Sequence, residues 1–365
     1  MAEFCRHLTN ALAYNNNTYE FTISPCCYFT PHSAIQSTDF DLPDYRKTWQ
    51  NSDLKKSCAI CLQMEQSGVY SYRQASFDIL EGKNDNLEML TVAINKQCNL
   101  ACPSCDSDSS SFWYQENIRN NIKQPSNIIK LHQEDKQGVI KDKFLEALSK
   151  QDLSNLRYIK FGGGEPLMSN IHVEVLDLIK NPENVTLQYT SNLSIMPTER
   201  ALKSWEKFKL VKWVGSIDGV GKRFTFLRWP YNWEKLNSFV KTAVSAVPYN
   251  VMFGVEHTLN PLNIFYFDEF EKWFDEHIKT NKVGDQSDLN LHLCWGDLDI
   301  SRTPPELRSV IKEKYKSTHP IVKLLDGVPI SAESSKLVNY LDILDKQRNQ
   351  DWRSTFSDVE GYFNV

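Results

Sequence analysis

The sequence predicts an α/β protein built on a partial (β/α)6 barrel, with a small N-terminal cysteine-rich domain and a helical C-terminal extension. Through the middle of the chain, short apolar runs alternate with stretches of helical periodicity, which is typical of parallel βαβ units. Cysteines gather before this alternation and at its start, and the last part of the chain lacks the alternation. We therefore expect a cysteine-rich domain at 1–84, a core at 85–296 and an extension at 297–365.

Six apolar runs are the candidate strands of the core, and they lie at 88–94, 157–161, 185–190, 210–217, 251–258 and 289–294. Six strands favour an open barrel over a closed eight-stranded one, and the active site of such a fold gathers at the carboxyl ends of the strands. Helical patterns lie at 109–122, 141–150, 170–180, 198–208, 233–245 and 264–278. An irregular insertion is expected at 123–139, because Pro125 and Gly138 interrupt that stretch.

The two flanking parts carry less regular patterns. The N-terminal part is predicted to be loop-rich, with a turn at 15–17, a pair of strands around it in the stretch 19–29, and a short helix within 62–81. The final stretch carries helix and loop patterns that could cover the open side of the barrel.

Composition and charge narrow the function. The 365 residues are 41% hydrophobic and 24% charged, as in an ordinary globular protein. The net charge is −5 and no basic block stands out, which argues against a general nucleic-acid partner, although a local patch could hold RNA or a nucleotide. No stretch approaches the roughly 20 apolar residues that cross a bilayer, and the start lacks a signal-peptide pattern. We expect a soluble, cytoplasmic protein without a membrane partner.

Three cysteines follow the first predicted core strand at a spacing typical of a metal centre. They are Cys98, Cys102 and Cys105. Thiolates are the natural ligands of iron–sulfur clusters, usually four per cluster, so three would leave one iron open. An open coordination position is the mark of a catalytic metal site, and that iron could chelate an amine and a carboxylate. A zinc ion with a fourth ligand from elsewhere, or three reduced thiols, are the alternatives.

This triplet and several later motifs resemble the radical S-adenosylmethionine (SAM) superfamily. The spacing Cys98-x3-Cys102-x2-Cys105, with Asn99-Leu100 after the first cysteine, resembles the hallmark of that family. The resemblance covers about residues 87–295. Further matching motifs follow the later strands, and they are Gly162-Gly163-Gly164-Glu165-Pro166, Thr190-Ser191-Asn192, Ser216-Ile217-Asp218-Gly219 and Arg228.

The resemblance implies a role for each motif. The three cysteines would hold a [4Fe–4S] cluster that reductively cleaves SAM to methionine and a 5′-deoxyadenosyl radical, which abstracts hydrogen from a substrate. The glycines would let the backbone approach the SAM ammonium, with Glu165 as an anionic partner. Arg228 would pair with the SAM carboxylate, a task suited to a forked donor. The remaining SAM contacts would come from Ser191, Asn192, Ser216 and Asp218.

Five cysteines precede the core. Cys58 and Cys61 form a Cys-x2-Cys pair, which is typical of metal binding, and Cys5 with the Cys26-Cys27 pair could complete a four-ligand site. Together with Phe4, Glu65, Gly68 and the serine run 109–111 before Phe112-Trp113, they resemble radical SAM proteins that carry a twitch/SPASM-type auxiliary-cluster domain ahead of the core. The better-known twitch and SPASM domains follow the core instead.

That second resemblance implies an auxiliary iron–sulfur cluster on Cys5, Cys26, Cys58 and Cys61, with Cys27 as the alternative to Cys26. A structural zinc, or reduced or disulfide-bonded thiols, are the other interpretations. After the last two strands, His257, Asn260, Asn263 and Cys294 are further candidates for contacts with SAM or substrate, with helix capping or core packing as the alternatives.

The sequence thus predicts an oxidoreductase-like radical SAM enzyme with two iron–sulfur clusters. Its partners would be SAM, a substrate that could be a peptide, a sugar or a nucleotide, and a reductant such as flavodoxin or ferredoxin. A radical SAM methyltransferase or an RNA- or nucleotide-modifying enzyme is the first alternative. A zinc-stabilised interaction protein on a degenerate barrel is the second alternative.

Overall fold

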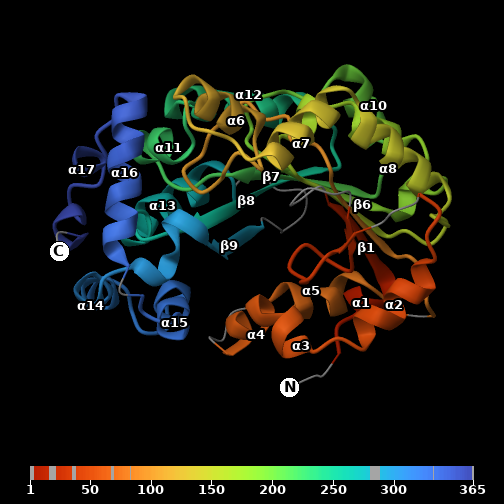
Figure 1. Cartoon of the computed structure of the whole chain (residues 1–365), viewed down its shortest axis with the longest axis horizontal. Coiled ribbons are helices and arrows are strands. Elements are labelled where there is room, and N and C mark those ends of the chain that lie inside the picture. The colour runs from red at the N-terminus through yellow and green to blue at the C-terminus, as the bar shows by residue number, and fades with distance from the viewer. Residues whose placement is uncertain are drawn as a thin grey trace.

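The computed structural model describes residues 4–15, 22–34, 38–66, 70–82, 84–279, 288–331 and 333–363. The strands in these ranges form one sheet in the order β3-β2-β1-β4-β5-β6-β7-β8-β9 (Figure 1). Pairing is parallel from β1 through β4 to β9, whereas β2 and β3 join in antiparallel pairs. The strands are β1 (Ala11–Asn15), β2 (Thr22–Ser24), β3 (Ser33–Ala34), β4 (Met89–Ala93), β5 (Tyr158–Phe161), β6 (Thr186–Ser191), β7 (Leu210–Ser216), β8 (Val251–Leu259) and β9 (Leu289–Leu293).

The six strands expected for the core are confirmed as β4 to β9, and they lie side by side in chain order. Helices between successive parallel strands make this a series of βαβ units. Side-chain caps begin three of the helices, because Ser110 accepts from the N–H of Trp113, Thr198 from that of Ala201 and Asn232 from that of Lys235. The helices of this region are α6 (Ser111–Arg119), α7 (Ser126–Lys136), α8 (Val139–Ser149), α9 (Ile171–Leu176), α10 (Glu199–Trp205), α11 (Gly221–Leu227), α12 (Trp233–Ala246) and α13 (Phe267–His277).

One prediction for the core is wrong, because the stretch 123–139 holds helix α7 rather than an irregular insertion. Pro125 stands directly before the helix, where the N–H that proline lacks would have no intrahelical partner. Gly138 follows the helix with a φ of 78°, the left-handed conformation that ends many helices. Ile128 and Leu131 are buried on the inner side. The two residues that suggested a loop therefore mark the ends of a helix.

The two faces of the core sheet differ in chemistry. In β6, the partly exposed Thr186, Gln188 and Thr190 alternate with buried residues. Successive side chains of a strand point to opposite faces, so one face is polar and the other apolar. On the apolar face, Tyr189 packs on Trp205 of α10 with ring centroids 4.9 Å apart. Parallel sheets usually pack apolar side chains on both faces, and the polar face is therefore a natural place for a binding site.

The N-terminal segment contains more regular structure than expected. β1 and β2 form an antiparallel pair, with Ala13 opposite Ser24, but only β2 lies in the stretch 19–29 that is predicted to hold the strand pair. Residue 15 of the predicted turn ends β1, and residues 16 and 17 lie outside the described residues. β1 also pairs in parallel with β4, so the sheet continues across the predicted boundary at residue 84. The helices of this segment are α1 (His7–Asn10), α2 (Leu42–Gln50), α3 (Leu54–Ser57), α4 (Ala59–Gln66) and α5 (Tyr72–Ile79).

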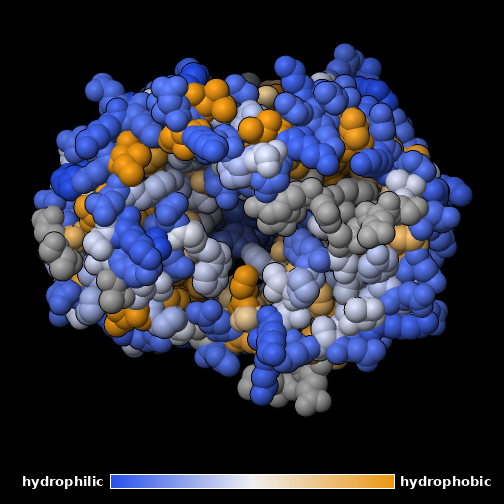
Figure 2. Space-filling view, viewed as in Figure 1, coloured by the Kyte–Doolittle hydropathy of each residue, from blue (hydrophilic) through white to orange (hydrophobic). Residues whose placement is uncertain are grey.

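The C-terminal segment forms α14 (Pro305–Lys314), α15 (Pro320–Gly327), α16 (Ser334–Arg348) and α17 (Trp352–Thr355). The Tyr340 hydroxyl of α16 donates to the carbonyl of Pro103 at 2.9 Å, so this helix lies on the loop that carries the cysteine triplet. α15 packs against α4, so the C-terminal segment contacts the N-terminal segment on one side of the molecule (Figure 1). In the same view, Figure 2 shows the surface hollowed between the N-terminal and C-terminal helices.

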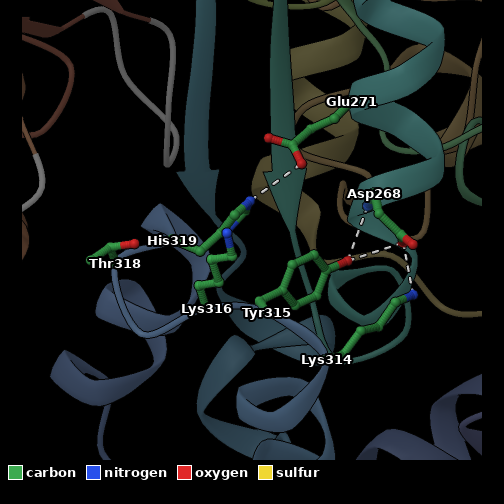
Figure 3. A pocket seen from close by; sticks show the side chains of 7 residues that line it. All are labelled: Asp268, Glu271, Lys314, Tyr315, Lys316, Thr318 and His319. Atoms are coloured by element: carbon green, nitrogen blue, oxygen red, sulfur yellow. Dashed lines mark hydrogen bonds and ion pairs between the residues drawn. The ribbon is translucent and has the colours of Figure 1, made fainter.

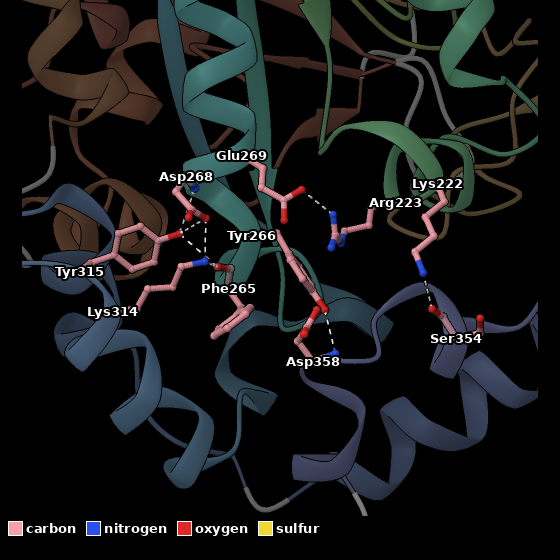
Figure 4. Close-up of polar contacts among 10 residues, drawn as sticks. All are labelled: Lys222, Arg223, Phe265, Tyr266, Asp268, Glu269, Lys314, Tyr315, Ser354 and Asp358. Carbon is pink, nitrogen blue, oxygen red and sulfur yellow. Dashed lines mark hydrogen bonds and ion pairs between the residues drawn. The ribbon is translucent and has the colours of Figure 1, made fainter.

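Polar contacts attach the C-terminal segment to the core (Figure 4). Lys222 of α11 donates to the carbonyl of Ser354 at 2.5 Å, and Lys314 of α14 pairs with Asp268 of α13 at 2.7 Å. Within the described part of the chain, no helix is long and apolar enough to cross a membrane.

Candidate active site

The cysteine loop leaves the carboxyl end of β4, and the start of α6 holds its backbone. The Ser111 hydroxyl accepts from the N–H of Cys98 at 3.1 Å and donates to the carbonyl of Cys98 at 3.2 Å. The indole N–H of Trp113 donates to the carbonyl of Cys102 at 2.8 Å. The Ser110 hydroxyl caps α6 and also donates to the loop backbone. The serine run ending in tryptophan therefore fixes the shape of the cysteine loop.

The glycine segment after β5 packs against the chain that leads into Cys98. A Cβ on Gly164 would lie 2.3 Å from the carbonyl oxygen of Gln97, and one on Gly163 would lie 2.8 Å from that of Asn95. Gly163 also has a φ of 101°, which favours glycine. A Cβ on Gly162 meets nothing within 4 Å. For Gly163 and Gly164, glycine is thus required by close backbone packing beside the cysteine loop.

Glu165 joins the ends of β5 and β6 in one network. Its carboxylate accepts from the Ser191 hydroxyl at 3.0 Å and from the N–H of Asn192 at 2.7 Å. The Asn192 amide in turn donates to Asn99 at 2.9 Å and lies 3.9 Å from the sulfur of Cys98. Burial raises the pKa of Glu165 to about 7. The predicted residues Glu165, Ser191 and Asn192 are therefore together, and this network reaches the first cysteine of the triplet.

Arg228 and Asp218 form a second network at the next cysteine. Their ion pair is 2.7 Å long, with side chains 10% and 2% exposed. A second guanidinium nitrogen of Arg228 lies 3.8 Å from the sulfur of Cys102, and Asp218 also accepts from the N–H of Thr258 at 2.8 Å. Arg228, predicted to pair with a SAM carboxylate, pairs in this structure with a carboxylate of the chain itself, that of Asp218. The remaining predicted residue, Ser216, ends β7 in register with Glu256.

The three thiols of the triplet influence one another. A hydrogen bond with Cys105, and then the charge of Arg228, lower the pKa of Cys102 to about 7. The same hydrogen bond raises the pKa of Cys105, while burial raises that of Cys98 to about 11. Cys102 is buried, Cys98 is partly exposed and Cys105 is exposed.

Among the described residues, no three cysteine, histidine, aspartate or glutamate side chains are placed to hold one metal ion. The thiolates of an iron–sulfur cluster bind different iron atoms and need not converge on a point. Three thiols on one loop, electrostatically coupled and partly accessible, fit such a cluster better than a single zinc ion.

The N-terminal cysteines come together from three separate stretches of the chain. Burial raises the pKa of Cys5, Cys26, Cys58 and Cys61, to about 11 for Cys58 and about 12 for Cys61. A negative charge on Cys5 raises the pKa of the other three further. Cys5, Cys26, Cys58 and Cys61 are all buried. The buried Arg73, which pairs with Glu65, lowers the pKa of Cys5 and Cys58. Thiolates are the natural ligands of iron–sulfur clusters, and these four thiols are the candidate ligands of one.

Cys27 differs from these four cysteines. It is only partly buried, and although its charge affects Cys26 and Cys61, its own pKa responds to burial and then to Lys160 and Glu256. Those two side chains lie on the polar face of the core sheet. The structure therefore distinguishes Cys27 from Cys26, which the sequence could not do.

Two surface cavities lie away from both cysteine groups. One, of about 350 Å³, lies between α13 and the start of α15 and is lined by Asp268, Glu271, Lys314, Tyr315, Lys316, Thr318 and His319 (Figure 3). Another, of about 410 Å³, is lined by Asp177, Glu199, Arg200, Lys203, Ser204 and Lys207. Their side chains are mostly paired with one another, as His319 is with Glu271 at 3.3 Å. Neither cavity has a cysteine in its wall.

Several residues near the triplet were not predicted. Asn99 and Ser194 complete the Glu165 network, with the Asn99 amide donating to the Ser194 hydroxyl at 2.8 Å. On the polar face, Lys160, Gln188 and Glu256 were also not predicted, although the alternation of side chains in β5 and β6 was a usable signal for the first two. Of the other candidates, Cys294 is buried, Asn260 bonds to nearby backbone, Asn263 donates to the carbonyl of Asp218 at 3.0 Å, and the His257 ring lies 4.2 Å from that of Phe270.

Neither a protein-family model nor a curated protein sequence matches this chain. Among solved structures, the chain is similar to native anSMEcpe with bound AdoMet, at 15% identity and a TM-score of 0.40, covering 67% of this chain and 63% of that chain. It is also similar to Streptococcus suis SuiB bound to S-adenosylmethionine (13% identity, TM-score 0.34, 90% of this chain, 58% of that chain). The chain is similar as well to SuiB bound to the precursor peptide SuiA, at 13% identity and a TM-score of 0.35, covering 88% of this chain and 58% of that chain. The chain thus spans less than two thirds of these structures.

Proposed function

We propose that this protein is a radical SAM enzyme. The observation that carries the proposal is the meeting of three strand ends at one cysteine loop. Cys98, Cys102 and Cys105 follow β4, the Glu165 network from β5 and β6 reaches Cys98, and the Arg228–Asp218 pair after β7 reaches Cys102. Residues from several strand ends around one centre are typical of active sites in parallel α/β folds.

In this proposal the triplet holds a [4Fe–4S] cluster, and with SAM bound that cluster supplies one-electron cleavage of the sulfonium to a 5′-deoxyadenosyl radical. The chain's own residues position the reactants. Ser111 and Trp113 fix the loop backbone, and Asn192 and Arg228 place polar hydrogens beside two of the sulfurs. Hydrogen bonds to ligand sulfurs tune the potential of such a centre. The backbone around Gly162 and the side chains of Ser216 and Asp218 would contact SAM.

We further propose that Cys5, Cys26, Cys58 and Cys61 hold an auxiliary iron–sulfur cluster, with Cys27 left free. The support is that these four thiols are buried together and that Cys27 lies toward Lys160 and Glu256. The twitch-like part at 1–84, the core at 85–296 and the extension at 297–365 belong to the same proposal, as do a flavodoxin- or ferredoxin-type reductant and a cytoplasmic location.

The partial barrel is supported by a contact across the sheet. Neighbouring strands lie about 4.8 Å apart, so β5 and β8 would be about 14 Å apart in a flat sheet. Lys160 of β5 nevertheless pairs with Glu256 of β8 at 3.5 Å. Side chains that stand perpendicular to a sheet meet over that span when the sheet curves toward them.

The test compares Cys102→Ser with Cys294→Ser, which changes a buried cysteine outside both groups. Each protein is reconstituted anaerobically with iron and sulfide, reduced with dithionite and incubated with SAM, and 5′-deoxyadenosine is measured by chromatography. Wild type and Cys294→Ser should form 5′-deoxyadenosine, and Cys102→Ser should not. Equal product from both variants would refute the assignment of the triplet.

A further inference from the structure

The polar face of the core sheet carries a charged cluster that the proposed SAM chemistry does not use. Glu256 is its centre and faces three donors from three other strands: Gln188 of β6 at 3.2 Å, Lys160 of β5 at 3.5 Å and His292 of β9 at 3.8 Å. Tyr158 donates to Gln188 at 2.5 Å and extends the cluster along β5. A cluster drawn from four strands lies inside the curve of the sheet rather than at its edge.

The N-terminal segment covers this cluster. The Tyr28 hydroxyl lies 3.0 Å from His292, and the Lys160 ammonium stands 5.6 Å above the ring of Tyr72. The thiol of Cys27 is close enough for its pKa to respond to Lys160 and Glu256. The cluster therefore lies between the core sheet and the N-terminal cysteine group.

The cluster is enclosed but still accessible. The side chains of Lys160, Glu256 and His292 are 17%, 11% and 29% exposed. The surface is hollowed between the N-terminal and C-terminal helices, the two parts of the chain on either side of this face (Figure 2). A small ligand that entered such a hollow would meet this polar face.

The contacts of Glu256 are loose compared with a structural pair on the same face. Ion pairs with good geometry are about 2.7–2.9 Å long, and Lys212 of β7 meets Asp288 at 2.7 Å. Lys160 and His292 instead stand 3.5 Å and 3.8 Å from Glu256. At 3.5 Å the charges of Lys160 and Glu256 attract each other without a tight hydrogen bond, so groups of a ligand can compete for each of them.

Charge balance decides which ligand fits. A ligand with a single charge would pair with Lys160 or with Glu256 and leave the other charge buried without its partner, which is costly. A neutral ligand would make no use of the ion pair. A ligand with both an ammonium and a carboxylate replaces one loose ion pair with two, the ammonium at Glu256 and the carboxylate at Lys160, and no charge is left unpaired.

We propose that the face formed by Lys160, Gln188, Glu256 and His292 is the substrate site, and that it binds a ligand carrying an ammonium and a carboxylate. The proposal rests on the proposed radical SAM function and specifies its substrate class. The two groups could belong to a free α-amino acid or to a basic and an acidic side chain of a peptide. The shared chemistry is the pair of opposite charges a few ångströms apart.

The experiment is calorimetric titration of the full-length, reconstituted protein in the presence of SAM. The probes are the twenty common free L-amino acids and a tripeptide with blocked ends that has a lysine and a glutamate side chain. Binding of an amino acid identifies the first source, and binding of the tripeptide identifies the second. For a free amino acid that binds, acetylating its amine or amidating its carboxylate should weaken binding about 10-fold or more, the value of one charge-assisted hydrogen bond. Binding by none of these probes, or no loss on blocking a charge, would overturn the proposal without any variant of the protein.

Variants then locate the site. Lys160→Met and Glu256→Gln should each weaken the bound probe about 10- to 100-fold. Lys212→Met removes an ion pair of the same face and should leave both probe binding and SAM cleavage unchanged. If Lys160→Met weakened SAM instead of the probe, the cluster would hold SAM and the substrate assignment would be wrong. Failure of wild type to cleave SAM would instead refute the proposed function, so the two failures are distinguishable.

Discussion

The two cysteine groups of this molecule are built in different ways. Cys98, Cys102 and Cys105 lie on one loop, are partly accessible and follow a strand of the core. Cys5, Cys26, Cys58 and Cys61 come from three stretches of the chain and are all buried. A local group keeps its spacing whatever the rest of the chain does, whereas an assembled group depends on the fold around it. The triplet is suited to an open reactive centre, and the four N-terminal cysteines are suited to a closed one.

Both groups nevertheless have a buried arginine–carboxylate pair beside them. Arg228 with Asp218 stands next to Cys102, and Arg73 with Glu65 stands next to Cys5 and Cys58. A guanidinium near a thiol favours the thiolate, which is the form that binds metal. In the triplet the pKa of Cys102 is lowered to about 7, whereas in the N-terminal group burial outweighs Arg73 and the pKa of Cys5 and Cys58 stays raised.

The largest expected difference between the groups is in SAM cleavage. Replacing Cys98, Cys102 and Cys105 by alanine should reduce 5′-deoxyadenosine formation to background, because no ligand of the reactive centre remains. Replacing the four buried N-terminal cysteines should remove a second set of irons and retain SAM cleavage. Iron analysis and chromatography check both, with circular dichroism to confirm folding. Cleavage that disappears in the N-terminal variant while its fold is intact would contradict the division of roles.

The arginine–carboxylate pairs should matter about equally for stability. Asp218→Asn and Glu65→Gln each leave a buried guanidinium without its charged partner, and each should cost about 3–5 kcal/mol in the free energy of unfolding. Urea denaturation measures this cost. Only Asp218→Asn should also weaken SAM cleavage, since only Arg228 contacts the triplet. Equal effects of the two substitutions on cleavage would mean that both cysteine groups serve the same step.

A pH dependence should appear on the triplet side through Glu165. Burial raises the pKa of its carboxyl from 4.5 to about 7 in the folded protein. Between these values this carboxyl ionises in the unfolded chain while it stays protonated in the folded chain, so its contribution to the free energy of unfolding should fall by about 3 kcal/mol as the pH rises from 4.5 to 7 and then level off. The buried His7, His172 and His257, whose pKa values are lowered, act in the opposite direction, so urea unfolding of cofactor-free wild type and Glu165→Gln at pH 5 and pH 8 isolates the Glu165 contribution as the difference between the two proteins. If the free energy of unfolding changed between pH 5 and pH 8 by the same amount in Glu165→Gln as in wild type, the pH dependence would belong to another group.

The smallest effect is expected far from both groups. Lys314 and Asp268 form a partly exposed ion pair between α14 and α13, visible in Figure 4. Such pairs contribute about 0–1 kcal/mol, so Lys314→Met should change the free energy of unfolding by no more than that. SAM cleavage should be unaffected. A loss of cleavage would show that the C-terminal segment acts on the centre.

The same contrast between local and assembled features explains what the sequence could predict. The strands β4 to β9 and the triplet are local patterns, and all six strands were found within a residue or two. α7 was missed because Pro125 and Gly138 also mark helix ends, and the parallel pairing of β1 with β4 joins residues far apart in the chain. The cluster around Glu256 draws on four strands, and Lys160 reaches it from β5, three strands away from Glu256 in β8.

The hydrogen-bond networks at the triplet were predicted only in part. The resemblance identified Glu165, Asp218 and Arg228 as site residues, but it did not predict their partners. Glu165 bonds to Ser191 and Asn192, and Asp218 pairs with Arg228. Such partners depend on which strand ends are neighbours, and spacing alone does not supply that information. The glycines beside them were expected at a cofactor, and for Gly163 and Gly164 the contact is with the chain's own backbone.

The most direct test of the central claim is the metal content and SAM reactivity of the wild-type protein after anaerobic reconstitution with iron and sulfide. The account predicts about four irons that depend on the triplet, further iron that survives the triple alanine variant, and 5′-deoxyadenosine when dithionite and SAM are added. Zinc as the only bound metal, with no 5′-deoxyadenosine formed, would contradict it and favour a zinc-stabilised interaction protein.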